Sequence, residues 1–483
     1  MFEHALASQS TPESAALLER IGEASRAEAR AAAERLAAVG ELLLVRCRDS
    51  GEQADWAADA WDAVAAQVGA ALHCGVAMGH SYLRYAMAMR ERLPKVGEVF
   101  AAGDIDYRAF QTIVFRTDLI TDTEALAKVD ARLAVRLARC PSLTRGGLAA
   151  VVDQVVAAVD ADAVRRAREA VADRYVDVVA DQSGMAWLEG KLMAPDGQAL
   201  DRRLDQVAAG VCAGDPRSAK QRRADALGAL AAGADRLVCR CGNSQCAAAA
   251  PVAGNVVIHV VAEQASVEGT GSAPGVLAGR EGLIPAEVIA ELAGSARLVP
   301  VRLPDPAPEP HYAPSAKLAE FVRCRDLTCR APGCDRPATA CQVDHTIPWA
   351  DGGATHPSNL KCLCPLHHLL KTFWGWRDEQ LPDGTVIWRL PDGHTCVTTP
   401  GSALLFPGLC ASTGVVPVPS PPSPATTERC GERTAMMPRR TRTRAQHRAQ
   451  RIATERGHNR RTRLDTHTPS TGPAPPDDEP PPF

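Results

Sequence analysis

Apolar residues recur at three- and four-residue spacing through the first third of the chain, with charged residues at the positions between them. The pattern is clearest in residues 31–45, 56–72, 126–137 and 148–159. This periodicity is typical of amphipathic helices. Before the last of these stretches, Ser142 or Thr144 could cap the next helix. The sequence therefore predicts a helical bundle over residues 24–170.

The pattern changes in the next part of the chain. Residues 174–179 (RYVDVV) and 256–261 (VVIHVV) are β-branched runs of strand length, and the helical pattern returns between them at 197–211. Residues 299–314 then contain six prolines, a spacing that excludes a helix and favours an extended linker. We expect the helical bundle to pass into an α+β part that ends at this linker.

The composition supports a mainly helical protein. Apolar residues make up 46% of the 483 positions but aromatic residues only 4%, so the core is expected to be aliphatic and alanine-rich, which favours packed helices over a β-sandwich. The longest apolar stretch, 246–262, is broken by proline, glycine and polar residues, so no membrane helix is expected. The first ten residues lack a secretion signal, and we expect a soluble, cytoplasmic protein whose 16 cysteines are thiols or metal ligands.

The net charge of −3 conceals a strong asymmetry. Residues 428–464 hold 12 arginines, no lysine and three acidic residues, a net charge of +9. Proline-rich stretches flank this region, and we expect a disordered tail over residues 415–483. Its arginines, among them Arg439, Arg440, Arg442 and Arg444, would contact nucleic-acid phosphates, with a solvated linker as the alternative. Because no aromatic residues are interleaved, duplex DNA is the expected partner.

A chain of this length is expected to form two or more units. We predict an N-terminal extension (1–23), a helical to α+β domain (24–298), the proline-rich linker (299–314), a compact Cys/His-rich module (315–400) and the tail (415–483).

The Cys/His-rich module carries the most informative pattern. In order it contains Cys329-Arg-Ala-Pro-Gly-Cys334, Val343-Asp344-His345, Gly352-Gly353, Ser358-Asn359-Leu360 and Cys364-Pro-Leu-His367-His368-Leu-Leu-Lys371. One histidine or cysteine pair alone would be an ordinary packed or surface feature. The combination, in this order and spacing, resembles the HNH endonuclease family, a fold in which two strands and a helix surround a metal.

Four residues of the module have the types and spacing of a zinc site. The Pro-Gly turn brings Cys329 and Cys334 together, and Cys364 and His367 have the spacing that lets two side chains converge on one tetrahedral ion. The resemblance selects these four over the competing cysteines at positions 324, 341 and 362. Loss of this structural zinc should unfold so small a module.

The resemblance also implies a catalytic site. Asp344 and His368 match the residues that bind a divalent ion, Mg²⁺ or Mn²⁺, and their donor types suit such an ion. His345 matches the general base that activates water, for which an imidazole pKa near neutrality is suitable. Asn359 matches the residue that orients this histidine.

Three neighbouring positions bear on this assignment. His367 and His368 point about 100° apart on a helix, so they cannot bind the same ion; we assign His367 to zinc and His368 to catalysis. Lys371 could contact a phosphate or be a solvated helix residue. Many HNH proteins have a further metal-binding histidine where this chain has Thr372, so two protein ligands would hold the ion loosely.

The region before the module resembles the actinobacterial domain of unknown function 222, found in mycobacterial thirteen-E-twelve repeat proteins. The resemblance covers residues 24–300 and rests on Leu93-Pro94, Gly103-Asp104-Ile105, the run at 221–227 and the cysteine motif at 239–246. The resemblance implies a domain architecture rather than a mechanism. Oligomerisation of the protein through the helical part stays open as an alternative. Within the motif, Cys239, Cys241 and Cys246 could bind a second zinc whose fourth ligand the sequence leaves unidentified.

We therefore expect a mainly α protein with a zinc-stabilised ββα-metal module that acts as a metal-dependent DNA endonuclease. Two alternatives stay open. One is a non-catalytic, zinc-containing protein that binds nucleic acid or serves assembly, which Thr372 and the basic tail favour. The other is a nuclease that cleaves RNA, since the ββα site contacts phosphate and need not read the base.

Overall fold

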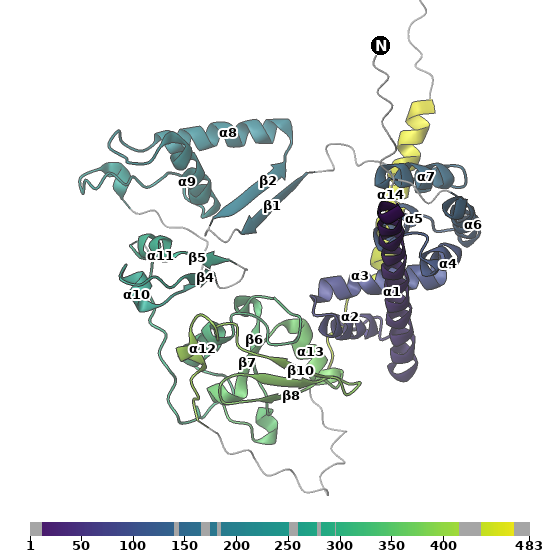
Figure 1. Cartoon of the computed structure of the whole chain (residues 1–483). Coiled ribbons are helices and arrows are strands. Elements are labelled where there is room, and N and C mark those ends of the chain that lie inside the picture. The colour runs from purple at the N-terminus through teal and green to yellow at the C-terminus, as the bar shows by residue number, and fades with distance from the viewer. Residues whose placement is uncertain are drawn as a thin grey trace, which may run out of the picture. The chain divides into compact units, whose positions relative to one another are not determined.

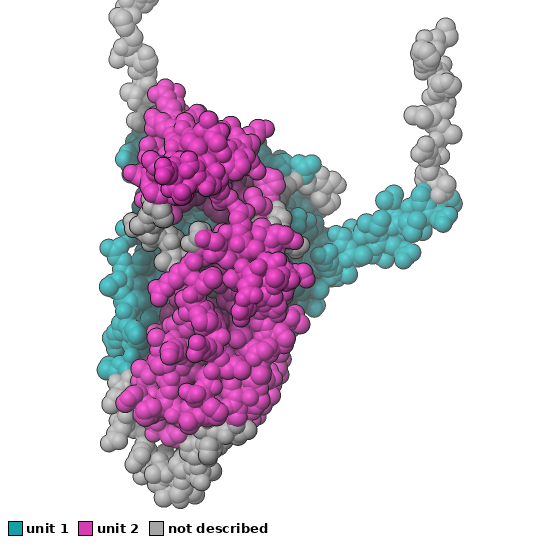
Figure 2. Space-filling model, turned by 90° about the vertical axis from the view of Figure 1, so that its left-hand side faces the viewer, with its two compact units in different colours: residues 1–167, 427–483 teal, residues 168–426 magenta. Residues whose placement is uncertain are grey.

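The computed structural model of the chain describes residues 12–139, 144–165, 174–180, 185–250, 259–277, 282–294, 296–414 and 436–467 (Figure 1). The chain forms two compact units, Met1–Ala167 with Thr427–Phe483 and Arg168–Thr426, which Figure 2 shows in different colours. The first unit is thus built from two separate stretches of the chain. None of the helices in the described ranges combines the length and apolar character needed to cross a membrane.

The N-terminal stretch of the first unit is helical, as predicted. Its helices are α1 (Pro12–Ser50), α2 (Ala60–Ala71), α3 (Val76–Met87), α4 (Pro94–Ala102), α5 (Tyr107–Thr117), α6 (Thr123–Arg139) and α7 (Arg145–Ala157), with a π-helical turn at Ala88–Arg92 and a 3₁₀ turn at Ala161–Ala163. Of the two candidate caps before α7, Thr144 accepts a hydrogen bond from the Gly147 amide. Helix α1 begins at Pro12, so the expected N-terminal extension is part of this helix from that residue onward.

The core of the first unit is aliphatic with few aromatic rings. Leu36, Leu83 and Leu133 have no exposed surface, and the rings of Phe100 and Phe110 stack at 4.9 Å between centroids. Small residues let helices approach closely: a Cβ added at Gly79 of α3 would lie 2.0 Å from the Ala65 carbonyl oxygen of α2. This packing agrees with the alanine-rich core predicted from composition.

A second stretch of the chain, residues 436–467, completes this unit. Helix α14 (Arg444–His467) inserts Ile452, only 4% exposed, into the same apolar core. The arginines of this stretch form ion pairs with aspartates of the N-terminal stretch: Arg440 and Arg444 with Asp59, Arg448 and Arg451 with Asp118, Arg456 with Asp160 and Arg463 with Asp162. The prediction of disorder is therefore wrong for residues 436–467.

The physical reason lies in charge complementarity that composition alone does not reveal. The excess of +9 in residues 428–464 is opposed by an excess of −12 in the rest of the chain. Arg444, Arg448 and Arg451 recur at helical spacing, so α14 presents them together to the buried Asp59 and Asp118. The other residues of the predicted tail, 415–435 and 468–483, lie outside the described residues.

The second unit begins with short α+β elements. Strand β1 (Tyr175–Ala180) pairs antiparallel with β2 (Ala186–Lys191), followed by α8 (Ala194–Ala209) and α9 (Ala219–Ala231). A small sheet of β3 (Val260–Val261), β4 (Gly275–Leu277) and β5 (Leu283–Ile284) accompanies α10 (Gln264–Val267) and α11 (Ala286–Ala293). The strand predicted at 174–179 and the helix predicted at 197–211 are confirmed by β1 and α8. Of the strand predicted at 256–261, residues 256–258 lie outside the described residues.

The proline-rich segment 299–314 has neither helix nor strand, as predicted, but its end is attached to the Cys/His-rich module. Glu309 forms an antiparallel bridge with Thr355, and its carboxylate accepts hydrogen bonds from the Ser315 amide and hydroxyl. The segment is therefore docked at one end rather than a free spacer.

The Cys/His-rich module has the expected ββα arrangement. Its elements are α12 (Ala316–Asp326), β6 (Gln342–His345), β7 (Leu360–Leu363), α13 (Pro365–Phe373), β8 (Arg377–Gln380), β9 (Val386–Arg389) and β10 (Thr395–Thr398). Strands β6 and β7 are antiparallel, with Asp344 opposite Lys361. Helix α13 follows β7 directly, with Pro365 in its first turn. The fold class, a mainly helical chain with a small ββα module, is confirmed.

Candidate metal and catalytic centre

The four residues predicted to bind the structural zinc converge in space. Donor atoms of Cys329, Cys334, Cys364 and His367 all lie within 4.8 Å of one another. The Nδ1 atom of His367 is 3.6 Å from Sγ of Cys329 and 3.2 Å from Sγ of Cys364. A tetrahedral zinc ion with bonds of about 2.0–2.3 Å separates its ligands by about 3.5 Å, so this group could bind zinc.

Local structure explains why these side chains meet. Gly333, in the predicted Pro-Gly turn, adopts φ +69°, and the Cys329 amide donates to the Arg336 carbonyl at 2.7 Å, which closes the loop. Cys364 caps α13, so His367 points back toward it one turn later and is fully buried. The competing cysteines at 324, 341 and 362 lie outside this four-residue group.

The predicted catalytic metal ligands also approach each other. Asp344 is at the end of β6 and His368 on α13, and Nε2 of His368 is 3.3 Å from Oδ1 of Asp344. Nδ1 of His368 is 2.6 Å from the Gln342 side-chain oxygen, which can only accept, so Nδ1 donates and, in the neutral ring, Nε2 carries the lone pair. A lone pair and a carboxylate oxygen that face each other are well suited to share a cation.

Two lysines, one of which sequence reasoning missed, contact the other oxygen of this carboxylate. The ammonium groups of Lys361 and Lys371 lie 2.9 and 2.7 Å from Oδ2 of Asp344, and both also pair with Asp378. Burial raises the pKa of the Asp344 carboxyl, but the charges of Lys361 and Lys371 outweigh it and lower that pKa to about 2. Asp344 is therefore ionised at neutral pH. Its Oδ2 contacts the two lysines, and its Oδ1 faces His368.

These contacts change the expectation for Lys371. Its side chain is 13% exposed and its ammonium lies among carboxylates, so it is neither a solvated helix lysine nor a free contact for phosphate. Fully buried Lys361 was not predicted, although its register opposite Asp344 follows from pairing the two strands. Asp378, on β8, comes after the HNH motif in the chain. No pattern in the neighbouring sequence indicated that it would pair with these lysines.

His345, the predicted general base, is held by the loop between the two strands. Its Nε2 atom is 3.0 Å from the Thr355 hydroxyl, whose own proton is donated to the His311 carbonyl at 2.6 Å. The hydroxyl must therefore accept from Nε2–H, which leaves the lone pair on Nδ1. This Nδ1 makes no hydrogen bond to the described residues. Burial is the main cause that lowers the pKa of the His345 imidazole below its usual value.

Asn359, predicted to orient His345, supports it through the loop rather than by contact. Its side-chain oxygen accepts from the Ile347 amide at 2.8 Å, and its side-chain nitrogen donates to the carbonyls of Ile347 and Ala354. The loop leaves no room at Gly353, where an added Cβ would lie 1.8 Å from the Ile347 carbonyl oxygen. Asn359 thereby positions the backbone next to Thr355, which sequence reasoning missed.

The position of the expected third metal ligand is turned away. The Thr372 hydroxyl donates to the His368 carbonyl within α13. Among the residues described, no third histidine, cysteine or carboxylate completes a cluster with Asp344 and His368. Among the described residues, Asp344 and His368 are thus the two candidate ligands for the catalytic cation.

The thiols of Cys239, Cys241 and Cys246 also meet, and the missing fourth residue is Cys212. Cys212 follows α8 and is far in the chain from the motif at 239–246. The spacing of the motif therefore did not identify it as a ligand.

The arginines predicted to contact nucleic acid lie in the first unit, and their partners are protein groups. Arg440 and Arg444 pair with Asp59, Arg439 with Asp55, and Arg442 donates to the Gln450 side chain. These side chains are not the free cations of a flexible tail, and the expectation of such a handle is corrected for them.

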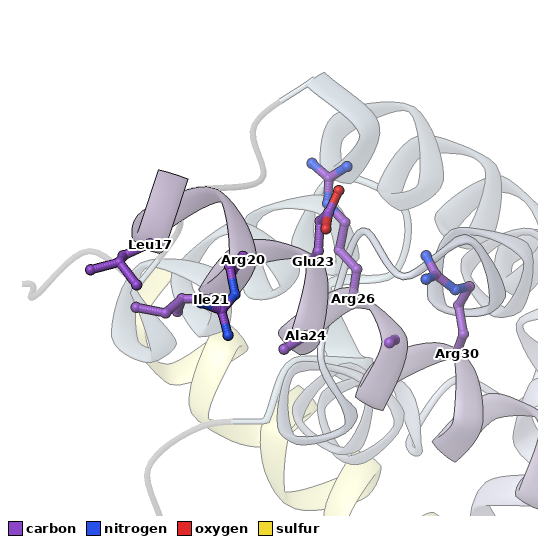
Figure 3. Close-up of a pocket in the computed structure, with 8 residues that line it drawn as sticks. Leu17, Arg20, Ile21, Glu23, Ala24, Arg26 and Arg30 are labelled. Atoms are coloured by element: carbon purple, nitrogen blue, oxygen red, sulfur yellow. The ribbon is translucent and has the colours of Figure 1, made fainter. Parts of the chain in front are cut away.

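A surface hollow of about 970 Å³ lies along α1, lined by eight residues between Leu17 and Arg30 (Figure 3). All eight are exposed and belong to one helix. Because a single helix cannot surround a ligand, we assign no site there.

Comparison with known proteins accounts for nearly the whole chain. Residues 23–326 match the family described as "Domain of unknown function (DUF222)", and residues 324–373 match "HNH endonuclease". "Uncharacterized protein Rv3776" of Mycobacterium tuberculosis (strain ATCC 25618 / H37Rv) is 46% identical over 477 residues, which cover 92% of this chain and 90% of that protein.

A second relative from the same strain, "Uncharacterized protein Rv2100", is 44% identical over 490 residues, which cover 92% of this chain and 88% of the relative. No solved structure matches the chain significantly. The length and identity of these matches show that the chain belongs to the DUF222 family and carries an HNH endonuclease domain at residues 324–373.

Proposed function

We propose that the ββα module is a metal-dependent endonuclease that hydrolyses phosphodiester bonds of DNA, with His345 as general base. The HNH domain implies a nucleic-acid substrate. The observation that carries the proposal is the hydrogen-bond chain from His345 through the Thr355 hydroxyl to the His311 carbonyl. It leaves one ring nitrogen of His345, Nδ1, with a lone pair and without a hydrogen bond to the described residues, on the residue that follows Asp344 in β6.

The His345 imidazole is suited to take a proton from water. Its lowered pKa means that the ring is neutral near pH 7, which is the form a base requires. Because the Thr355 hydroxyl fixes the proton on Nε2, the incoming proton goes to Nδ1. The imidazolium that forms is next to Asp344, whose carboxylate stabilises positive charge.

Asp344 and His368 would hold the divalent cation through Oδ1 and Nε2. Two ligands at about 2.1 Å and right angles on an octahedral ion lie about 3 Å apart, close to the 3.3 Å observed. When bound, Mg²⁺ or Mn²⁺ would stabilise charge on the phosphate and on the leaving 3′-oxygen. Lys361 and Lys371 keep the carboxylate ionised and in place through its other oxygen.

The zinc group gives the module its frame. Cys329 precedes β6, while Cys364 and His367 follow β7 and open α13, so an ion bound there would join the elements that carry Asp344 and His368. Around it the module buries Trp376 and Trp388, whose rings lie 5.9 Å apart. Structural zinc would therefore fix the distance between the two candidate metal ligands.

The test is conversion of supercoiled plasmid by the full chain with Mg²⁺ or Mn²⁺. His345→Ala should lower the rate by about 10²-fold or more, whereas His394→Ala, at an exposed histidine of the same module, should leave it unchanged. Equal activity of the His345→Ala variant and the wild type would show that the cleavage comes from a contaminant.

Thr372 supports one competing function, a non-catalytic nucleic-acid-binding or assembly protein. Salt-dependent DNA binding without cleavage under any divalent metal would select it. Competition between labelled duplex DNA and RNA of equal length separates the DNA-cleaving from the RNA-cleaving nuclease.

A further inference from the structure

A group of four cysteines lies in the second unit outside the nuclease module. Cys212 follows α8, and Cys239, Cys241 and Cys246 follow α9. Their sulfur atoms all lie within 4.8 Å of one another, and Sγ of Cys212 is 3.5 Å from Sγ of Cys239. Four thiolates around a tetrahedral zinc ion, each about 2.3 Å from it, are separated by about 3.8 Å. The spacing therefore fits a single ion.

The backbone around these cysteines is folded tightly enough to place them. The Cys239 amide donates to the Ala248 carbonyl at 2.8 Å, and the Cys246 amide to the Asn243 carbonyl at 3.0 Å. Gly242 adopts φ +74°, which allows the chain to reverse between the second and third cysteine. All four residues carry free thiols rather than disulfides.

A charged network joins the loop of Cys212 to the segment that bears Cys239. The Asp215 carboxylate accepts from the Arg217 guanidinium at 2.7 Å and from the Arg240 amide at 2.9 Å. The same guanidinium donates to the Val238 carbonyl at 2.7 Å. Asp215 and Arg217 thus hold together the two segments that carry these cysteines, as residues around structural metal sites do.

The surrounding structure has little else to stabilise it. The apolar cluster between α8 and α9 contains four buried residues, namely Val207, Ala208, Ala226 and Leu237. A core of this size contributes little against the entropy of ordering the loops, and small structures of this kind commonly depend on a metal or disulfides.

We propose that Cys212, Cys239, Cys241 and Cys246 bind one zinc ion that fastens the loop after α8 to the segment after α9. Four protein ligands leave no position for water or substrate, so the site is structural. The site is separate from the Cys₃His group of the nuclease module. The proposal therefore does not depend on whether that module cleaves DNA.

The experiment is metal analysis of the full chain by plasma mass spectrometry together with native mass spectrometry. The wild type should contain two zinc ions per chain. Cys212→Ser and Cys364→Ser should each contain one, because each removes a ligand from a different group. Cys74→Ser is the matched control, since this partly buried free thiol of the first unit lies outside both groups, and it should keep two.

Cobalt substitution of the wild type keeps the proposal testable if Cys212→Ser fails to fold. Two Co²⁺ ions with intense thiolate charge-transfer absorption should bind, and Cys246→His, which replaces a ligand by another ligand, should retain both ions with a shifted spectrum. One zinc ion in the wild type, iron in place of the second zinc, or a disulfide between Cys212 and Cys239 would each overturn the assignment.

Discussion

The ring of Tyr312 stacks on the imidazole of His345, with 5.3 Å between centroids and 13° between planes. Tyr312 belongs to the proline-rich segment, whose docking on Thr355 places it there. Trp349 approaches the same imidazole at 6.1 Å. The candidate base is thus held between a hydrogen bond at its edge and an aromatic ring on its face.

We expect Tyr312→Ala to lower kcat by about tenfold with a smaller change in KM, because an aromatic pair contributes about 0.5–1.5 kcal/mol to holding the ring plane. Tyr312→Phe keeps the ring and should behave as wild type. Steady-state nicking assays measure both constants. An equal loss in the Phe variant would mean that the hydroxyl, not the stacking, is responsible.

Thr355→Val should impair the base without changing the volume of the side chain. It removes the acceptor for His345 Nε2–H and the donor to the His311 carbonyl, and leaving the buried His345 nitrogen unpaired costs about 1–3 kcal/mol. We expect kcat to fall by about 10–100-fold. Thr355→Ser keeps the hydroxyl and should retain most activity; a Ser variant as weak as the Val variant would contradict the assigned hydrogen-bond chain.

The first unit should lose stability in acid through Asp118. Burial raises the pKa of its carboxyl, but the hydrogen bond and charge of Arg448, with Arg92 and Arg451, outweigh it and hold that pKa below the usual value. With an unfolded pKa of about 3.9, the contribution is complete above that pH and is lost as pH falls through the folded pKa.

Hydrogen-exchange mass spectrometry on the full chain measures this effect. The contribution of Asp118 to the protection of α14 peptides should not change with pH near neutrality. It should fall below about pH 4. Asp118→Asn should weaken protection at neutral pH and reduce the further loss in acid. An unchanged acid profile in this variant would show that other carboxylates control the docking of α14.

Helix α14 should contribute stability rather than affinity for DNA. Ile452→Ala should destabilise the first unit by about 2–5 kcal/mol because it leaves a cavity in the apolar core, and Ile452→Val should cost about 0.5–1.5 kcal/mol. Urea unfolding followed by hydrogen exchange of peptides from the first unit measures the difference.

The ion pairs of this helix allow a separate comparison. Arg444→Ala should loosen the first unit, because Asp59 and Asp62 lose a partner. Arg461→Ala should not, because within the described part of the chain its guanidinium bonds to the Gly457 carbonyl of its own helix. Neither change should alter the salt dependence of DNA binding. A weaker salt dependence in Arg444→Ala would restore the role in phosphate contact that the sequence suggested.

The HNH module was predictable because its motif residues are close together in the sequence. His367 and His368 lie on one helix that Cys364 caps, and Asp344 and His345 end one strand, so spacing and resemblance were enough to bring these residues together. The residues that were missed act over long distances in the chain. The Thr355 hydroxyl joins His345 to the His311 carbonyl, which lies 44 positions before Thr355. Cys212 lies 27 positions before Cys239.

The arginine-rich helix was missed for a different reason. Composition shows that residues 428–464 are too charged to form a core alone, but it cannot show that aspartates of another part of the chain neutralise them. The fold class can be predicted from periodicity within a segment. Whether a charged segment is ordered depends on the oppositely charged residues that it contacts elsewhere in the chain.

The return of α14 to the first unit has a consequence for biosynthesis. Domains generally fold as units while the ribosome is still elongating the chain. The α1–α7 bundle cannot gain Ile452 or its arginine partners until residue 467 has been translated, so the nuclease module between them is complete first. During that interval Asp59 lacks the guanidinium groups of Arg440 and Arg444, whereas Asp118 already has Arg92 and Arg165 as partners.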